Sequence, residues 1–230
     1  MDIILVPGLW LDASSWDAVS PALTAAGHRV HPLTPPGVGA PAEQSAEVGI
    51  ADWVNAVVER IDELAGDVVL VGHSGGGNVV WGAADVRPDR VRRVVFVDTV
   101  PPPPGHAISE FPVVDGVIPF PGWDFFPDED VSDLTPEVRA RTAPAAKSVP
   151  ARVPTDPIAL SGDRHRVPVT LLMGGLDQEG FESQVDDWGP YGEEYRAIDD
   201  ATVVRIGSGH WPQFSVPDRL AALILEAVAR

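Results

Sequence analysis

Short apolar runs, rich in β-branched residues, recur along the chain and are bounded by charged residues, glycine or proline. Runs such as "DVVLVG", "RRVVFVD" and "PVTLLMG" show no polar alternation, which is typical of strands buried on both faces of a parallel sheet. The pattern predicts strands at residues 2–6, 29–33, 68–71, 94–97, 169–173 and 202–206.

Longer segments with helical periodicity separate these runs. They predict helices at residues 15–26, closed by Gly27, at about 48–65, closed by Gly66, at 75–86 and at 216–230. Strands that alternate with helices imply right-handed crossovers. We therefore predict an α/β fold, with a doubly wound, mostly parallel six-stranded sheet and helices on both faces.

The segment from residue 99 to residue 166 breaks this rhythm. Its many prolines exclude a regular central strand or a long helix, apart from a helix from Pro136 to about Lys147 with Thr135 as its N-cap. The segment also carries five aromatic residues: Phe111, Phe120, Trp123, Phe125 and Phe126. These favour an irregular Pro-rich cap over a solvated loop, and predict a core of residues 1–98 and 167–230 with a cap insertion at 99–166.

Composition limits the functional classes. The 34 acidic and 16 basic side chains give a net charge of −18, which disfavours binding to nucleic acid or to an anionic membrane surface. The absence of cysteine excludes disulfides, thiolate metal sites and a cysteine nucleophile. The first apolar run is too short for a signal peptide or a membrane span, so we expect a cytoplasmic protein.

Residues Gly72-His73-Ser74-Gly75-Gly76 fit the motif G-x-S-x-G between a predicted strand and a predicted helix. In such a tight turn the residues two before and two after the serine crowd together, so Gly72 and Gly76 must be small. Ser74 would project above the sheet, and the Gly75 amide would point toward a developing oxyanion. A dinucleotide-binding turn is the rival interpretation, but Ser74 stands where its second glycine belongs. A merely structural serine is the other alternative.

A serine nucleophile needs a base and an acid downstream. His210, in "RIGSGHWPQFS" after the last predicted strand, is the candidate base. Asp177, just beyond the fifth strand, is the favoured acid, and Asp98, at the end of the fourth, is the alternative. His73 adjoins Ser74, but strand alternation turns it away. The remaining histidines lie in or beside the second strand or the cap: His28, His31, His106 and His165.

The loop after the first strand and the aromatic residues complete the predicted site. The Leu9 amide, after Gly8, can supply a second oxyanion donor, and Trp10 is the next candidate. An apolar substrate pocket is predicted from Trp10, Trp123, Phe125, Phe126 and Trp211, most of which could equally belong to the core. Eight acidic residues and one arginine lie between Glu179 and Asp200; if they rim the entrance, anionic substrates should bind poorly.

These residues together resemble the α/β-hydrolase superfamily, and within it the small plant-type esterases and hydroxynitrile lyases with their bacterial relatives. "PGLWLDASSW" is similar to that group's H-G-x-x-H-G-x-W segment, "GHSGGG" to its nucleophile elbow, "GGLDQ" to its acid loop and "GSGHWPQFSVPDRL" to its histidine loop and final helix. The resemblance implies the α/β-hydrolase fold without its two leading strands. Pro7 stands where the group has histidine.

The resemblance also narrows the chemistry. Ser74 argues against dehalogenases and epoxide hydrolases, which carry aspartate at the elbow, and Trp211 replaces the lysine that follows the histidine in the lyases. We therefore expect a serine hydrolase that cleaves a small, largely apolar carboxylic ester or lactone and needs no metal or organic cofactor. A cofactor-free lyase or oxygenase on the same scaffold, or a non-enzymatic ligand-binding relative, remains the alternative. The sequence leaves the oligomeric state open.

Overall fold

Six parallel strands form the central sheet of the computed structural model, which describes all 230 residues. The strands lie in the order β2-β1-β3-β4-β7-β8, and every neighbouring pair is parallel. Each predicted strand is present with small changes at its ends: β1 Asp2–Val6, β2 Arg29–Pro32, β3 Val68–His73, β4 Val91–Val97, β7 Val169–Met173 and β8 Ala201–Arg205. The predicted α/β fold with a parallel six-stranded sheet is confirmed.

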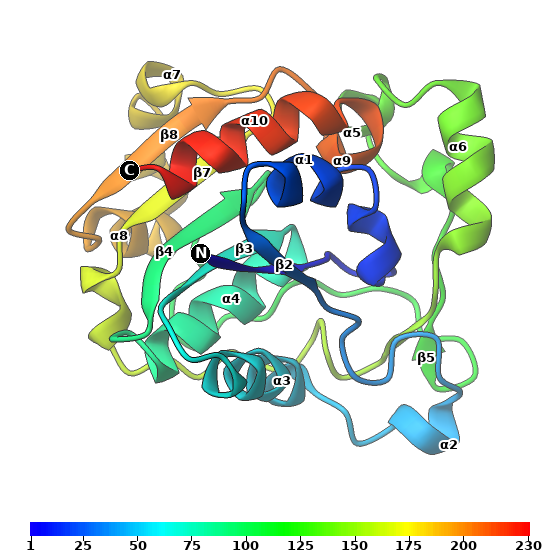
Figure 1. Ribbon diagram of the computed structural model, residues 1–230. Helices are drawn as coiled ribbons and strands as arrows, with labels where there is room; N and C mark the ends of the chain where they lie inside the picture. Colours follow the sequence, from blue (N-terminus) through cyan, green and yellow to red (C-terminus); the bar gives the residue numbers. More distant parts are fainter.

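Helices cover both faces of this sheet (Figure 1). Helices α1 (Ser20–Ala25) and α10 (Pro217–Val228) pack together on one face, and α3 (Ile50–Glu63) and α4 (Gly75–Val86) pack together on the other. The alternating side chains of β1 divide accordingly, because Ile3 and Leu5 join the hydrophobic cluster of α10 while Ile4 and Val6 join that of α3 and α4. The sheet is therefore buried on both sides, as its unbroken apolar runs require.

Four predicted helices are shorter than expected; α10 lacks only terminal residues of its predicted range, and the other three differ for a local reason. The predicted helix at 15–26 is split into the 3₁₀ helix η1 (Ala13–Trp16) and α1, because Pro21 is accepted only in the first turn of a new helix. Likewise, α6 (Pro136–Thr142) ends before Pro144, which lies in the 3₁₀ helix η3 (Ala143–Ala145). Helix α3 begins at Ile50, where the Gly49 amide donates to Asp52. The predicted N-cap Thr135 is confirmed, since its side chain accepts from the Val138 amide.

Most of the segment 99–166 forms short elements on the side of α5 and α6 in Figure 1, whereas its last residues, 163–166, pack against α4. Trp123 and Leu134 are buried there, together with Trp211 from outside the segment, so the segment is packed and not solvated. Its elements are β5 (Val117–Ile118) paired antiparallel with β6 (Val149–Pro150), the 3₁₀ helices η2 (Trp123–Phe125), η3 and η4 (Asp163–Arg166), and helices α5 (Asp128–Val131) and α6.

The remaining short helices escaped the sequence prediction because each has only one or two turns. They are α2 (Ala42–Ser45), α7 (Gln178–Glu182), η5 (Val185–Trp188), α8 (Pro190–Arg196) and α9 (Pro212–Ser215). A segment this short contains too few apolar positions to establish a helical period. Two of them matter below, since α8 and α9 each bring one residue to the site.

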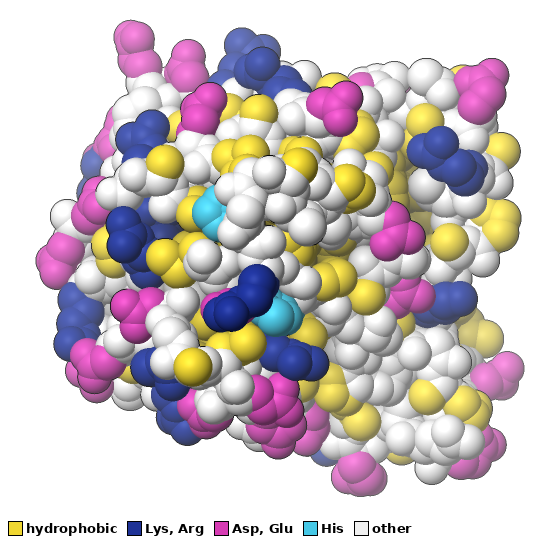
Figure 2. All heavy atoms as spheres, viewed as in Figure 1, with side chains coloured by type: hydrophobic (Ala, Val, Ile, Leu, Met, Phe, Trp, Pro, Cys, Tyr) yellow, Lys and Arg dark blue, Asp and Glu magenta, His cyan; other side chains and the backbone are white.

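The surface carries charges of both signs. Figure 2 shows acidic and basic side chains spread over one face, with hydrophobic side chains between them. The large hydrophobic side chains that are exposed anywhere on the molecule are few: Met1, Val86, Val113, Val114 and Phe125. No helix combines enough length and apolar character to cross a lipid bilayer.

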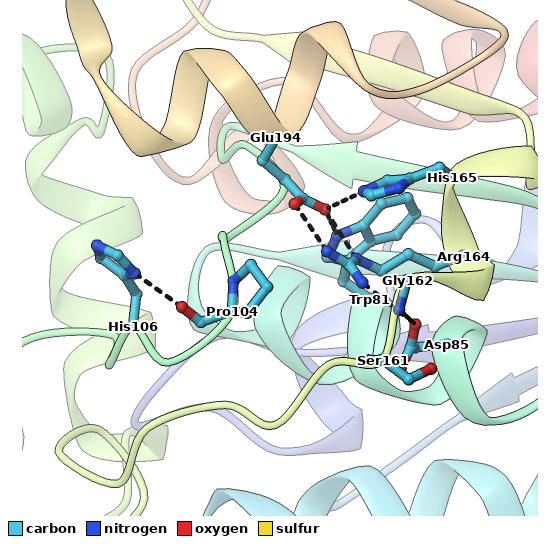
Figure 3. Close-up of polar contacts among 9 residues, drawn as sticks. All are labelled: Trp81, Asp85, Pro104, His106, Ser161, Gly162, Arg164, His165 and Glu194. Carbon is cyan, nitrogen blue, oxygen red and sulfur yellow. Dashed lines mark hydrogen bonds and ion pairs between the residues drawn. The ribbon is translucent and has the colours of Figure 1, made fainter.

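A buried ionic network joins the end of segment 99–166 to helices α4 and α8 (Figure 3). Arg164, 1% exposed, binds both carboxylate oxygens of Glu194, with Nε–Oε1 at 2.8 Å and Nη2–Oε2 at 2.7 Å. Its Nη1 lies 3.2 Å from Oδ1 of Asp85, and the Trp81 indole donates to Glu194 Oε1 at 2.8 Å. Every charge in the network is therefore paired and hydrogen-bonded, as burial demands.

Asp85 ties this network to the backbone of the segment. Its carboxylate accepts the amides of Ser161 at 2.6 Å and Gly162 at 3.0 Å. Burial opposes the ionisation of Asp85, but these hydrogen bonds and the one from Arg164 outweigh it, so the pKa of the carboxyl lies below its ordinary value. The network thereby fixes residues 161–164 against the helix that begins at Ser74.

We predict that Arg164→Met lowers the free energy of unfolding by about 3–5 kcal/mol, because it leaves two buried carboxylates without a counter-ion. Arg166→Met is the matched control: Arg166 is two residues away, and its ion pair with Asp89 is exposed, so its loss should cost about 0–1 kcal/mol. Urea unfolding of both variants measures the difference. Equal effects would show that the buried network contributes no more than the surface pair.

Candidate active site

The turn between β3 and α4 holds Ser74 in a conformation that few side chains adopt. Its φ is 51° and its ψ is −126°. A Cβ on Gly72 would lie 2.5 Å from the Gly76 carbonyl oxygen, and a Cβ on Gly76 would lie 2.5 Å from that of Pro7. Both distances are far below van der Waals contact, so larger residues would push the turn apart. This geometry agrees with the crowding predicted for the G-x-S-x-G motif.

Backbone strain concentrates around this turn. Only four residues other than glycine have a positive φ, and three of them are Trp10 at 65°, Ser74 at 51° and Asp98 at 46°. Each follows closely on the carboxyl end of one of three adjacent strands, β1, β3 and β4. Strained residues of this kind cost about 1–3 kcal/mol each and cluster where a protein holds functional groups in place.

His210 is paired with Asp98. Its Nδ1 lies 2.7 Å from Asp98 Oδ2, and the other oxygen of Asp98 accepts the Gly174 amide at 2.7 Å. Burial opposes the ionisation of Asp98, but the hydrogen bond and charge of His210 and the amide of Gly174 outweigh it, and the pKa of Asp98 lies below its ordinary value. An ionised Asp98 accepts a hydrogen bond from the Nδ1–H group of His210, which leaves Nε2 without a proton and able to accept one.

The favoured assignment of Asp177 as the partner of His210 is therefore corrected. Asp177 is exposed and caps helix α7, where its Oδ1 accepts the Gly180 amide at 2.9 Å. Asp98 follows β4, the direct neighbour of β3 in the sheet, and is thus nearer to the nucleophile turn. Gly174 makes room for it, because a Cβ there would lie 2.9 Å from Asp98 Oδ1. The sequence did contain a signal for Asp98, which is an aspartate at the end of β4, the strand next to β3.

His73 and Gln213 form a buried chain behind His210. His73 Nε2 lies 2.7 Å from the His210 carbonyl oxygen, which can only accept, so Nε2 carries the proton. Its unprotonated Nδ1 then accepts from Nε2 of Gln213 at 3.3 Å. Both side chains are 1% exposed, and burial together with the nearby His210 lowers the pKa of His73 to about 3. The prediction that His73 turns away from the site is wrong: it supports the His210 backbone.

The opposite side of the His210 loop rests on helix α5. The His210 amide donates to the Asp130 carbonyl oxygen at 2.9 Å, and the Gly209 amide donates to Asp133 Oδ2 at 2.8 Å. A Cβ on Gly209 would lie 2.3 Å from the Asp130 carbonyl oxygen, so the loop approaches the helix as closely as a glycine allows. The backbone of His210 is thus held between the sheet, through His73, and the segment 99–166.

Ser74 and His210 line one cavity of about 280 Å³, together with the predicted oxyanion residues Leu9 and Gly75. The Leu9 amide lies in a loop and donates to no backbone acceptor, and the Gly75 amide is the first of α4, where no intrahelical partner exists. Both amides are thus free to bind a ligand oxygen. The structure contains no hydrogen bond between the Ser74 hydroxyl and His210, although both face this cavity.

The predicted substrate-binding residues divide into two groups. Trp10, Phe126 and Trp211 line the cavity. Trp123 does not, because it is buried in the small cluster beneath α5 and α6, and Phe125 does not, because it is 53% exposed at the surface. The rings of Trp10 and Trp211 both pack edge-on against Phe126, with centroids 5.7 and 4.6 Å away.

Sequence reasoning missed several residues of the cavity wall. Ile108 and Phe111 come from the irregular segment, and Tyr191 comes from the short helix α8. Of residues 179–200, only Tyr191 lines the cavity, and none of the eight acids does. Three of these acids form ion pairs elsewhere: Glu194 binds Arg164, and Glu182 and Asp186 bind Arg196. The carboxylate residue that lines the cavity is instead Asp130. No group of three or more His, Asp and Glu side chains is arranged to hold a metal ion.

A comparison with protein families agrees with this geometry. The model of the "Alpha/beta hydrolase family" matches residues 3–223 of the chain. The chain belongs to this family. The match spans the sheet, segment 99–166 and the His210 loop, so the turn at Ser74 and the histidine loop occur within one family domain.

Named relatives are similar over part of the chain. A carbendazim hydrolyzing esterase of Nocardioides sp. (strain SG-4G) is 37% identical over 109 residues, which are 46% of this chain and 45% of that protein. Esterase PIR7B of Oryza sativa subsp. japonica is 38% identical over 103 residues, 43% of this chain and 38% of that protein. The matched part of this α/β hydrolase thus spans less than half the length of these curated relatives.

Solved structures resemble the whole chain. An extracellular alpha/beta-hydrolase from a Paenibacillus species superposes with a TM-score of 0.78 at 23% identity, covering 99% of this chain and 98% of that one. The methylesterase MES16 from Arabidopsis superposes with a TM-score of 0.74 at 21% identity, covering 100% and 99%. At these identities the likeness establishes the fold.

We predict that His73 makes the protein less stable in mild acid. The unfolded chain protonates this histidine below a pH of about 6.5, whereas the folded chain keeps it neutral down to about pH 3. The unfolded state therefore gains protons first, and between pH 7 and pH 5 the free energy of unfolding falls by about 2 kcal/mol from this group. Urea unfolding of the wild type and of His73→Asn at both pH values measures it. The same decrease in both proteins would contradict a neutral, buried His73.

Proposed function

We propose that this α/β hydrolase is a serine hydrolase that cleaves a small, largely apolar carboxylic ester or lactone through an acyl-enzyme on Ser74. The observation that carries this proposal is the pairing of His210 Nδ1 with Asp98 in the cavity that Ser74 also lines. That pairing orients the imidazole so that its Nε2 can take a proton from Ser74. A serine hydroxyl needs such a base to become nucleophilic.

The reaction follows from these positions. His210 Nε2 takes the proton of Ser74 as Oγ attacks the ester carbonyl carbon, and Asp98 stabilises the imidazolium that forms. His210 then gives the proton to the leaving alkoxide, and the acyl group remains on Ser74. Water, deprotonated by the same imidazole, releases the acid and restores the hydroxyl. The Ser74–His210 hydrogen bond forms when substrate binds, as catalytic hydrogen bonds often tighten only in the complex.

The two free amides supply the electrostatic part of catalysis. The Leu9 and Gly75 amides bind the oxygen of the tetrahedral intermediate, and the N-terminus of the 12-residue helix α4 adds its positive end. Rigid donors of this kind need no reorganisation when charge develops, and one donor typically accounts for about 10²–10³ in rate. Trp10, whose φ is positive, follows Leu9 in the same loop, and its backbone conformation helps to orient the Leu9 amide.

The cavity and the relatives support a small substrate. A volume of about 280 Å³ lies at the lower end of the range of ligand pockets, which is about 300–1,000 Å³. Segment 99–166 acts as the cap that closes it, through Ile108, Phe111 and Phe126. The relatives include proteins named esterases, a pyrethroid hydrolase and plant methylesterases, so ester hydrolysis is the activity to test first.

We predict that a fluorophosphonate probe labels Ser74 and that the protein hydrolyses p-nitrophenyl esters of short acids. Ser74→Ala should abolish labelling and lower kcat by at least about 10³, because the nucleophile is lost. Intact-protein mass spectrometry and an absorbance assay measure the two effects. Hydrolysis that survives in Ser74→Ala would contradict an acyl-enzyme on this residue. Tight binding of small apolar molecules with no turnover would favour a ligand-binding protein instead.

We predict that Asp98→Asn lowers kcat by about 10⁴, because the asparagine oxygen stays on the Gly174 amide and its NH2 group faces Nδ1 of His210, which leaves the imidazole in the wrong tautomer. Asp177→Asn is the control, since asparagine caps a helix as well as aspartate does and activity should stay within about twofold. The same absorbance assay serves for both variants. A larger loss in Asp177→Asn than in Asp98→Asn would restore the assignment of Asp177 as the acid.

A further inference from the structure

Asp130 places an unpaired carboxylate in the wall of the active-site cavity. It lies on helix α5, and its backbone carbonyl accepts the amide of His210, so the residue is directly beside the catalytic base. Its side chain accepts no hydrogen bond and forms no ion pair within the chain. Burial, and the nearby charge of Asp98, raise the pKa of the Asp130 carboxyl, although His210 opposes the shift. Asp130 is half-buried and lacks the ion-pair partner that the buried acids Asp85 and Glu194 have.

Apart from the imidazole of His210, no residue of the cavity acts on Asp130 as a positive charge. No lysine or arginine lines it, and the wall is otherwise aromatic, aliphatic or neutral polar. The aromatic part consists of Trp10, Phe111, Phe126, Tyr191 and Trp211. An anionic substrate would meet a carboxylate with no compensating cation. A cationic one would meet both a counter-ion and the electron-rich faces of aromatic rings, the combination that recognises ammonium groups.

We propose that the substrate is an ester whose alcohol portion carries a protonated amine, and that Asp130 is the residue that selects it. This inference rests on the proposed hydrolase function and names its substrate class. The ammonium group pairs with the Asp130 carboxylate while its carbon substituents pack against Phe126 and Trp211. The net charge of the protein, −18, also attracts cations, but it does not direct them to one place in the cavity.

The alcohol side is assigned because Asp130 flanks His210. His210 gives its proton to the leaving oxygen, so the alcohol portion lies against the imidazole at that step. Asp130 is joined to His210 by a backbone hydrogen bond of 2.9 Å, and it is therefore close to the departing group. Leu9 and Gly75, which hold the carbonyl oxygen in the proposed mechanism, come from the loop after β1 and from the start of α4, and not from helix α5.

An isosteric pair of esters tests this assignment. 2-(Dimethylamino)ethyl butyrate, protonated at neutral pH, and 3-methylbutyl butyrate have nearly the same shape and differ in charge. We expect the wild type to prefer the ammonium ester by about tenfold in kcat/KM, the size of effect typical of one contact to a charged group. In Asp130→Asn the ratio of the two kcat/KM values should fall to within about twofold of one.

Asp128→Asn is the matched control, because Asp128 lies on the same helix but is exposed and does not line the cavity. It should keep the tenfold preference; an equal loss in both variants would attribute the preference to the general negative field and overturn the assignment. Equal kcat/KM values for the two esters in the wild type would overturn it as well.

The hydrolase function and the role of Asp130 are tested separately by measuring the dissociation constants of both esters for Ser74→Ala. This variant binds without cleaving, so an ammonium preference that depends on Asp130 should appear there too. If the wild type cleaves neither ester but Ser74→Ala binds the ammonium ester about tenfold more tightly, the Asp130 site stands and the hydrolase proposal fails. If the wild type cleaves both esters with equal kcat/KM values and Ser74→Ala binds them equally, the hydrolase proposal stands and the proposed role of Asp130 fails.

Discussion

The contact between the two ends of the β3–α4 turn is the constraint on which the site depends. Gly72 and Gly76 approach so closely that neither tolerates a side chain, and Gly76 is also pressed against the end of β1. This contact forces Ser74 into its strained conformation and places the first amide of α4 beside it. Because β1 touches the same turn, the Leu9 loop is positioned by the same packing. This one steric contact therefore determines the positions of both the nucleophile and the oxyanion donors.

The rest of the site is organised around the backbone of His210. The sheet side contributes His73, the segment 99–166 contributes Asp130 and Asp133, and the imidazole itself is turned by Asp98. Three of these residues thus act on His210 itself, and Asp133 holds the amide of the preceding Gly209. His73 is able to do so because burial keeps it neutral, and a neutral imidazole can donate at one nitrogen while it accepts at the other.

Much of the fold could be predicted from the sequence, because strands buried on both faces leave unbroken apolar runs. The turn at Ser74 could also be predicted, because a turn this tight has no room for side chains at positions 72 and 76 and therefore requires glycine there. The acid could not be decided, because Asp98 and Asp177 both follow strands of the same sheet edge, and only the adjacency of β4 to β3 separates them. Trp123 and Phe125 are neighbours in an irregular segment, and no periodicity tells which ring faces the core, the cavity or the solvent.

The attachment of the His210 loop to helix α5 has a consequence for how the cavity is filled. If α5 and the residues after it moved away from the sheet, the amides of His210 and Gly209 would lose their acceptors, Asp130 and Asp133. The imidazole would then leave its place beside Asp98. An open form of that kind would have no working base. Ile108 and Tyr191 also line the cavity but form no hydrogen bond to the His210 loop, so a displacement of these residues would leave the base in place.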